Sequence, residues 1–353
     1  MAEELRLKGE EKVTMALRSL YTSYGYRPYK MSRFEEYDLY AGNKDFLVSG
    51  NVITFTDTDR KLMALKPDVT LSIVKSVKDI KGAVSRICYD ENVFRVSGKS
   101  GTFREIMQAG LECIGDVSSV ELAEVVSLAQ KSLSVISDRS VLTISHMGIV
   151  EGFIRELTEE SKQKALNALA SKNVPELKSM GLDKLAELAG LTGSNEEIYA
   201  RLAEMAADSA GIDELKTIVS VLDQERVRID FSVLGGMKYY NGITFRGYVD
   251  GVPTAVLSGG QYDKLMKRMG KKSRAVGFAV YLDALERLLE DRSEYDVDVV
   301  LLYEDSDDVS SVLRRARALR EGGSSVLVLR SVPENLRYRD LISMGGRKEA
   351  PNA

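Results

Sequence analysis

The sequence contains a single histidine, His146, and two cysteines, Cys88 and Cys113, among its 353 residues. So few imidazoles and thiols argue against a zinc site, and no Cys-x-x-Cys pair is present to carry redox chemistry. Acid–base catalysis by histidine would rest on one residue. The residues therefore predict no metal and no other cofactor.

Long apolar segments are also missing. There is no run of 18 apolar residues, and the start has no basic segment followed by an apolar one. The sequence therefore predicts no membrane span, no secretory signal and a cytoplasmic location. Its hydrophobic content of 44% and charged content of 29% are ordinary for a globular protein, and its net charge of -4 gives no general attraction for nucleic acid. A chain of this length is expected to hold more than one folding unit.

Residues 227–233 alternate apolar and polar side chains and predict the strand around which the chain is organised, with one buried face. A Gly-Gly pair, the adjacent Tyr239 and Tyr240, and a second predicted strand over 243–249 follow. A second Gly-Gly pair precedes Tyr262. Glycines beside polar rings suit a small polar ligand, although each piece taken alone is better explained as a packed hairpin turn.

The first third of the chain predicts a helix over 3–24 and strands over 52–57 and 61–65. A further helix is predicted to start at Pro67, with Asp68 and Thr70 in its first turn. Capping of this helix explains the two polar side chains as well as a binding role does.

A long hairpin is predicted from residues 84–96 and 103–115. In its second strand Arg104, Gln108 and Glu112 recur four residues apart, which places them on one face. Such a row is either solvated or lines a polar pocket. Ser118 and Glu121 then form a capping box before a helix to Ile136.

Residues 150–212 are rich in Glu, Lys, Ala and Leu and predict a helical insertion with a small core of its own. Beyond residue 292 a strand–helix–strand pattern predicts parallel pairing in a short α/β unit, residues 293–353. Its predicted elements are a strand over 297–303, a helix over 309–321, a strand over 325–329, a helix over 335–344 and a polar tail over 345–353.

Several segments together resemble the histidyl-tRNA synthetases, in that family's order and over roughly residues 10–290. The matching segments are Phe55-Thr-Asp, Ala64-Leu-Lys-Pro-Asp-Val-Thr70, Phe94-Arg95, Gln108-Ala-Gly-Leu-Glu112, Met237-Lys-Tyr-Tyr-Asn241, Gly259-Gly-Gln-Tyr-Asp263 and Ala275-Val-Gly-Phe-Ala279. The resemblance implies an α+β fold, with a class II aminoacyl-tRNA synthetase-like antiparallel sheet flanked by helices. Residues 1–149 and 213–292 would form this core.

The sequence departs from the synthetases where they hold ATP. Gly235 stands where the family has the arginine that promotes activation of the histidine carboxylate, and Ala284 stands where motif 3 has its arginine. Arg95 remains, and Ser32 replaces the motif 1 proline. Adenylation needs fixed cations, and losing one costs orders of magnitude in rate. The C-terminal unit resembles half of an anticodon-binding domain, and the acidic balance argues against binding tRNA.

A synthetase-like chain without ATP chemistry resembles the regulatory subunits of ATP phosphoribosyltransferase, as does Ser145-His-Met-Gly148. This resemblance implies a non-catalytic subunit that activates a short catalytic subunit and mediates histidine feedback in the first step of histidine biosynthesis. It also implies a homodimeric core within a hetero-oligomer, expected to be a hetero-octamer.

The same resemblance implies a site for free histidine. Asp68, Thr70 and Gln108 would hold the α-amino group, while Glu112, Tyr240 and Tyr262 would face the imidazole. Tyr239 is a second-choice contact, and Arg95 and Arg104 are candidate pocket or anion contacts. The effector could instead bind at an interface with the catalytic subunit.

Two other functions fit the same residues. One is a divergent histidyl-tRNA synthetase, which would show histidine-dependent ATP–pyrophosphate exchange. The other is a histidine-binding sensor or scaffold for another partner. Arginines on the 309–321 helix could favour tRNA, but the acidic residues around them are typical of a solvated helix face.

Overall fold

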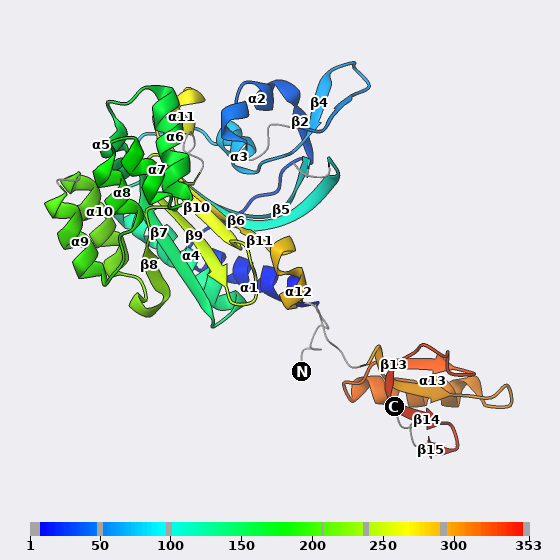
Figure 1. The fold of residues 1–353 in the computed structure, drawn as a ribbon. Helices are drawn as coiled ribbons and strands as arrows, with labels where there is room; N and C mark the ends of the chain where they lie inside the picture. The colour runs from blue at the N-terminus through cyan, green and yellow to red at the C-terminus, as the bar shows by residue number, and fades with distance from the viewer. Residues whose placement is uncertain are drawn as a thin grey trace. The chain divides into compact units, whose positions relative to one another are not determined.

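The computed structural model describes residues 8–47, 52–96, 101–205, 208–235, 240–289 and 295–348. The chain divides into two compact units, a larger one of residues 10–289 and a smaller one centred on residues 290–353 (Figure 1). Within the described ranges, no helix has the length and apolarity that crossing a bilayer requires.

An eight-stranded, mainly antiparallel sheet is the framework of the larger unit (Figure 1). In spatial order its strands are β1 (Arg27–Pro28), β5 (Val84–Val96), β6 (Phe103–Gly115), β11 (Arg274–Tyr281), β10 (Leu257–Gln261), β9 (Ile243–Val249), β7 (Ser140–His146) and β8 (Val227–Ile229). The hairpin of β5 and β6 has the predicted bounds and pairs in register along its whole length.

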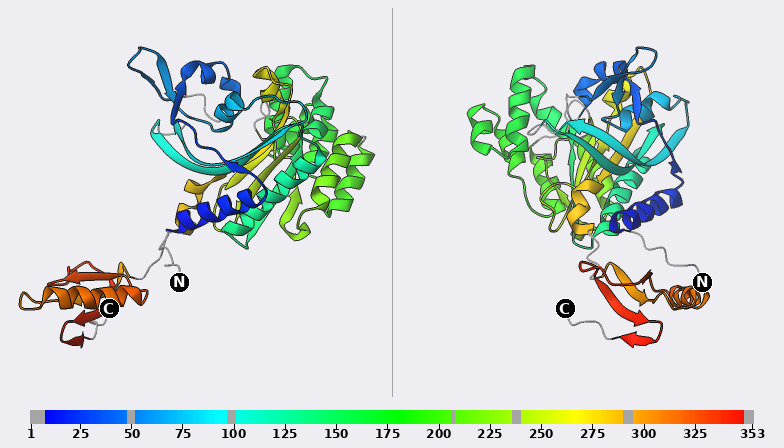
Figure 2. Two further views of the ribbon diagram at one scale, coloured as in Figure 1. Left: turned by 180° about the vertical axis from the view of Figure 1, so that it is seen from behind. Right: turned by 90° about the vertical axis from the view of Figure 1, so that its right-hand side faces the viewer.

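Helices α1 (Gly9–Ser23) and α4 (Ser119–Ile136) pack against one face of this sheet (Figure 2). Strand β6 shows how the two faces differ. Its Leu111 and Cys113 join the core beneath these helices, while Gln108 and Glu112, which alternate with them along the strand, point to the opposite face. Because β6 is buried on both faces from Gln108 onward, its sequence shows no simple apolar alternation.

Residues 150–212, predicted to be a helical insertion, lie in a series of short helices. They are α5 (Met147–Ile154), α6 (Glu159–Ala170), α7 (Val174–Ser179), α8 (Asp183–Ala189), α9 (Asn195–Glu204) and the start of α10 (Ser209–Ser220). The prediction that they enclose a separate core is wrong. Buried residues such as Leu169 and Leu185 belong to the same cluster as Leu142 and Ile144 of β7.

A three-stranded sheet and two helices stand before the hairpin, namely β2 (Phe34–Glu36), α2 (Tyr37–Ala41), β3 (Thr54–Thr56), β4 (Leu62–Leu65) and α3 (Thr70–Ser76). Helix α3 begins at Thr70 rather than at Pro67. The Pro67 carbonyl accepts a hydrogen bond from Arg95 Nε at 3.0 Å, which ties it to strand β5. Asp68 lies before the helix and accepts from the Leu71 amide at 2.9 Å.

The strand predicted over 227–233 is wrong in extent, and it is not the element around which the chain is organised. Strand β8 ends at Ile229 and lies at the edge of the sheet. Asp230 Oδ1 accepts from the Ser232 amide at 2.9 Å, so a turn replaces the strand. The apolar residues of the segment are nevertheless buried as far as Val233, which is why the sequence alternates beyond the strand.

Over residues 295–348 the smaller unit consists of a four-stranded sheet and one helix, α13 (Val309–Glu321). In spatial order its strands are β13 (Val326–Leu329), β12 (Val297–Leu302), β14 (Tyr338–Ser343) and β15 (Gly346–Lys348). The parallel pairing of β12 with β13 is confirmed. The helix predicted over 335–344 is wrong, because β14 pairs with β12 and buries Leu341, and β15 extends into the predicted tail.

The capping box of α4 provides a test of this local structure. The Ser118 hydroxyl accepts from the Val120 amide, and Glu121 accepts from the Ser118 amide. Replacing Ser118 by Ala should lower the free energy of unfolding by about 1 kcal/mol. Urea denaturation measures this loss, and Ser119→Ala, one residue further along the exposed helix start, should stay within about 0.5 kcal/mol. Equal effects of the two substitutions would contradict the capping role.

Candidate functional site

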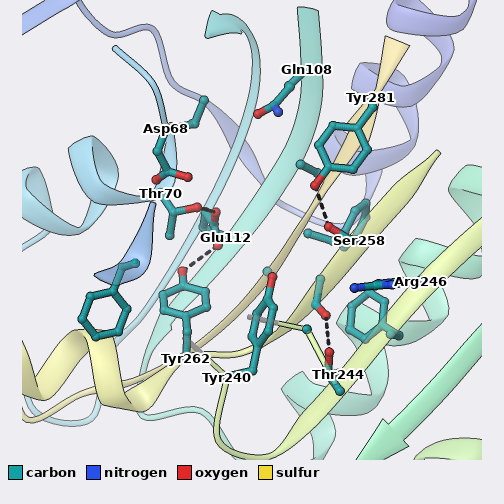
Figure 3. A pocket seen from close by; sticks show the side chains of 18 of the residues that line it. Asp68, Thr70, Gln108, Glu112, Tyr240, Thr244, Arg246, Ser258, Tyr262 and Tyr281 are labelled. Carbon is teal, nitrogen blue, oxygen red and sulfur yellow. Dashed lines mark hydrogen bonds between the residues drawn. The ribbon is translucent and has the colours of Figure 1, made fainter. Parts of the chain in front are cut away.

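A cavity of about 520 Å³ opens on the face of the large sheet opposite α1 and α4 (Figure 3). Its polar and aromatic lining includes Asp68, Thr70, Tyr89, Arg95, Gln108, Glu112, Tyr240, Thr244, Arg246, Ser258, Tyr262 and Tyr281. A cavity of this size and mixed lining is typical of small-molecule sites.

Four neighbouring strands form the floor of the cavity. Across β6, β11, β10 and β9, Glu112 stands opposite Gly277, Gly277 opposite Gly260, and Gly260 opposite Thr244. A Cβ on Gly277 would lie 1.8 Å from Glu112 Oε2, and one on Gly260 would lie 2.6 Å from the Tyr240 ring. Because these positions are glycines, the Glu112 carboxylate and the Tyr240 ring can lie close against the backbone of the sheet.

Glu112 is a deeply buried carboxyl group of the site, with 2% of its surface exposed. Thr70 Oγ1 donates to its Oε1 at 2.7 Å, and the Tyr262 hydroxyl donates to its Oε2 at 2.6 Å (Figure 3). Burial raises the pKa of Glu112 to about 8, against the lowering effect of these two hydrogen bonds. Nearby Asp68 adds to the rise. The site can therefore share a proton with a ligand near neutral pH.

Asp68 and Gln108 add polar groups on the same side of the cavity (Figure 3). Burial raises the pKa of Asp68, while the Leu71 amide and the Arg95 guanidinium oppose this rise. Gln108 is 3% exposed, and within the described part of the chain its Nε2 meets no hydrogen-bond acceptor. An unpaired buried amide is costly, so a polar ligand that pairs with it is favoured.

Two of the tyrosines that line the cavity, Tyr240 and Tyr262, are packed closely against neighbouring backbone. Gly235, at φ +56°, approaches the Tyr240 ring so closely that a Cβ would lie 2.3 Å from it. Tyr262 precedes helix α11 (Asp263–Arg268), and Asp263 Oδ1 accepts from the Ala275 amide of β11 at 2.9 Å. Tyr262 itself is 1% exposed. Both rings are therefore held by backbone geometry.

The structure brings most of the residues predicted for the site to this cavity. They are Asp68, Thr70, Gln108, Glu112, Tyr240, Tyr262 and Arg95. Arg104 does not lie with these residues. It stands at the start of β6, is largely exposed, and its guanidinium is 4.0 Å from the Asp283 carboxylate. It is not among the residues that line the cavity. Tyr239 lies outside the described residues.

Sequence reasoning missed four polar residues of the opposite wall, which are Thr244, Arg246, Ser258 and Tyr281. The Ser258 and Tyr281 hydroxyls are 2.6 Å apart (Figure 3). A signal was present in β9, where Thr244 and Arg246 alternate with the buried Ile243 and Phe245. The alternation does not tell which face lines a cavity, because that depends on the order of the strands.

The raised pKa of Glu112 predicts a pH-dependent stability. Its folded-state pKa of about 8 exceeds the ordinary value of 4.5, so the folded chain binds this proton more tightly than the unfolded chain. Stability should therefore fall as the pH rises from about 5 to about 8, by on the order of 3 kcal/mol from this group. Urea unfolding at several pH values measures the free energy of unfolding, which should fall over this pH range by more in the natural chain than in Glu112→Gln. An equal fall in the two proteins would contradict the prediction.

Comparison with known proteins gives the family. The family model of histidyl-tRNA synthetase matches residues 4–285. An ATP phosphoribosyltransferase regulatory subunit of Desulfitobacterium hafniense is 31% identical over 76% of this chain and 75% of its own. Another, of Clostridium kluyveri, is 28% identical over 90% of this chain and 88% of its own.

A solved structure from Bacillus halodurans, described as an ATP phosphoribosyltransferase regulatory subunit/histidyl-tRNA synthetase, shares the fold. Its TM-score is 0.76 at 21% identity, with 97% of each chain covered. This likeness confirms the predicted class II synthetase-like α+β fold. The chain therefore belongs to the histidyl-tRNA synthetase family and, within it, to the regulatory subunits of ATP phosphoribosyltransferase.

Proposed function

We propose that this chain is the regulatory, non-catalytic subunit of an ATP phosphoribosyltransferase, and that it binds free histidine in the cavity above β6. The observation that carries the proposal is the buried Glu112, held by Thr70 and Tyr262 at one end of a small-molecule cavity. Family membership supplies the enzyme on which it acts.

The polar groups of the cavity suit histidine. Asp68 and Thr70 offer oxygens that can accept from the α-ammonium group, and the side-chain oxygen of Gln108 can do the same. The unpaired Nε2 of Gln108 is a donor and would pair with an acceptor of the ligand. Glu112 and Tyr262 can face the imidazole. Because imidazole titrates near pH 6.5 and Glu112 near 8, the pair can share one proton at neutral pH.

Two positions of this chain support a non-catalytic role. They are Gly235 and Ala284, where the resemblance to the synthetases implies arginines. At Gly235 the Tyr240 ring and Thr244 Oγ1 occupy the space that a side chain would enter, at 2.3 and 2.8 Å from a Cβ. Ala284 lies in a short helical turn, Leu282–Leu285, and packs against the main core. Neither position offers a cation for a developing phosphoryl charge.

The proposal includes the assembly and its setting. A short catalytic subunit would bind a homodimer of the synthetase-like core, residues 1–149 and 213–292, within a cytoplasmic hetero-octamer. In this proposal residues 150–212 are a helical insertion in the core, and residues 293–353 are a separate C-terminal unit. Feedback requires that histidine binds the inactive assembly more tightly than the active one, and this coupling is reciprocal.

Mixing tests the proposed function directly. A short catalytic subunit from the same source should gain ATP phosphoribosyltransferase activity when this chain is added, and the activity should fall as histidine is titrated. Formation of phosphoribosyl-ATP, followed by absorbance, measures both effects. Absence of activation at any ratio of the two chains would sink the regulatory assignment.

Replacing Glu112 by Ala tests the place of the effector. The substitution removes the acceptor of two buried hydrogen bonds, so histidine binding measured by calorimetry should weaken at least about 100-fold. Inhibition of the mixed enzyme, measured against the variant's own activity without histidine, should be lost in parallel. Arg104→Ala, on the same strand but outside the cavity, is the matched control. Unchanged binding in Glu112→Ala would place the effector elsewhere, for example at the subunit interface.

Histidyl-tRNA synthetase activity is the second candidate, because the model of that family spans most of the chain. Histidine-dependent exchange of pyrophosphate into ATP measures it. We expect no exchange above background, because the two arginine positions are glycine and alanine. Exchange at a rate typical of a synthetase would favour this function over the regulatory one.

A further inference from the structure

Two arginines line the cavity, and they differ in what they already contact. Arg95 donates from Nε to the Pro67 carbonyl at 3.0 Å and acts on the carboxylate of Asp68. Arg246 of β9 is partly buried, and within the described residues no carboxylate lies at ion-pair distance from it. An arginine placed in this way is available to receive an anion in the cavity.

The position of Arg246 follows from the strand register. It stands opposite Ser258, which stands opposite Ala279, and Ala279 stands opposite Gly110. This row lies two residues from the row that holds Glu112, on the same face of the sheet. Arg246 and Glu112 are thus separated by three strand spacings across the sheet and two residues along it, or about 16 Å between backbones. Their side chains extend inward over this distance and leave room for one small molecule between them.

The charges of the cavity are arranged asymmetrically. Asp68, Thr70 and Glu112 lie on one side of the view in Figure 3, and Arg246 lies on the other, with the Tyr240 ring between them. Burial raises the pKa of the Tyr240 hydroxyl well above its ordinary value, and the positive charge of nearby Arg246 opposes this rise. A cavity with carboxylates at one end and a guanidinium at the other complements a zwitterion.

We propose that Arg246 binds the α-carboxylate of the amino acid and replaces the missing arginine at Gly235 in this part of recognition. The inference rests on the proposed histidine site and extends it from the amine and the imidazole to the third polar group of the ligand. It makes Arg246 a specificity-determining residue. The cavity then distinguishes histidine from amines that carry the same imidazole and no carboxylate.

L-histidinol is the probe for this role, because a hydroxymethyl group replaces the carboxylate while the amine and imidazole are kept. Calorimetry on the full chain should show that histidine binds at least about 10-fold more tightly than histidinol, from the charge-assisted hydrogen bonds to Arg246. Arg246→Gln should weaken histidine about 10- to 100-fold and change histidinol by less than about 3-fold. Arg246→Lys should restore part of the preference, since it keeps the charge and loses the planar fork.

Arg104→Gln is the matched control, because it removes the same charge from the same sheet outside the cavity. It should leave both affinities unchanged. Histidinol binding by Arg246→Gln shows that the variant retains a folded cavity. Equal weakening of both ligands, or of neither, overturns the role of Arg246 and leaves the histidine site standing. If the natural chain binds no histidine, the site proposed above fails, and this inference fails with it.

Discussion

A carboxylate buried in the middle of a sheet is the constraint on which the site depends. Glu112 lies on β6, where the chain is covered on both faces, and its charge is unfavourable there without partners. Thr70 and Tyr262, which are distant in sequence, supply those partners. The start of α3 and the start of α11 therefore both contact the same carboxylate on the sheet. The same buried group leaves the site with a proton to share near neutral pH.

The glycines of the floor are the second part of this arrangement. Gly277 leaves the space that the Glu112 carboxylate occupies, and Gly260 and Gly235 leave the space for the Tyr240 ring. The Tyr240 ring fills the space beside Gly235, the position at which the resemblance to the synthetases implies an arginine. Under the proposed function, the packing that holds this tyrosine therefore also accounts for the absence of a cation at that position. This is consistent with membership of a family that includes both synthetases and regulatory subunits.

Much of the fold follows from local pattern. The β5–β6 hairpin, the bounds of β9 and α13, and the capping box of α4 agree with the sequence prediction, because each depends on contacts near in the chain. Two errors have different causes. Tyr338–Ser343 forms a strand because the distant β12 pairs with it, which local propensity does not show. Val227–Ile229 ends early because Asp230 accepts from the Ser232 amide in a local turn, a signal that the apolar alternation of the segment outweighed.

The sequence by itself determined the residue types of the site and the spacing of Gln108 and Glu112 on one strand face, since period-two alternation needs no tertiary information. Only the tertiary structure decided which other residues share the cavity. The order β6-β11-β10-β9 places Arg246, 134 positions after Glu112 in the chain, on the same face of the sheet. Arg104 of β6 is outside the lining, on the part of the strand that extends beyond its pairing with β11. Strand order is set by long-range packing between segments, and it leaves no periodic trace in the sequence of any one strand.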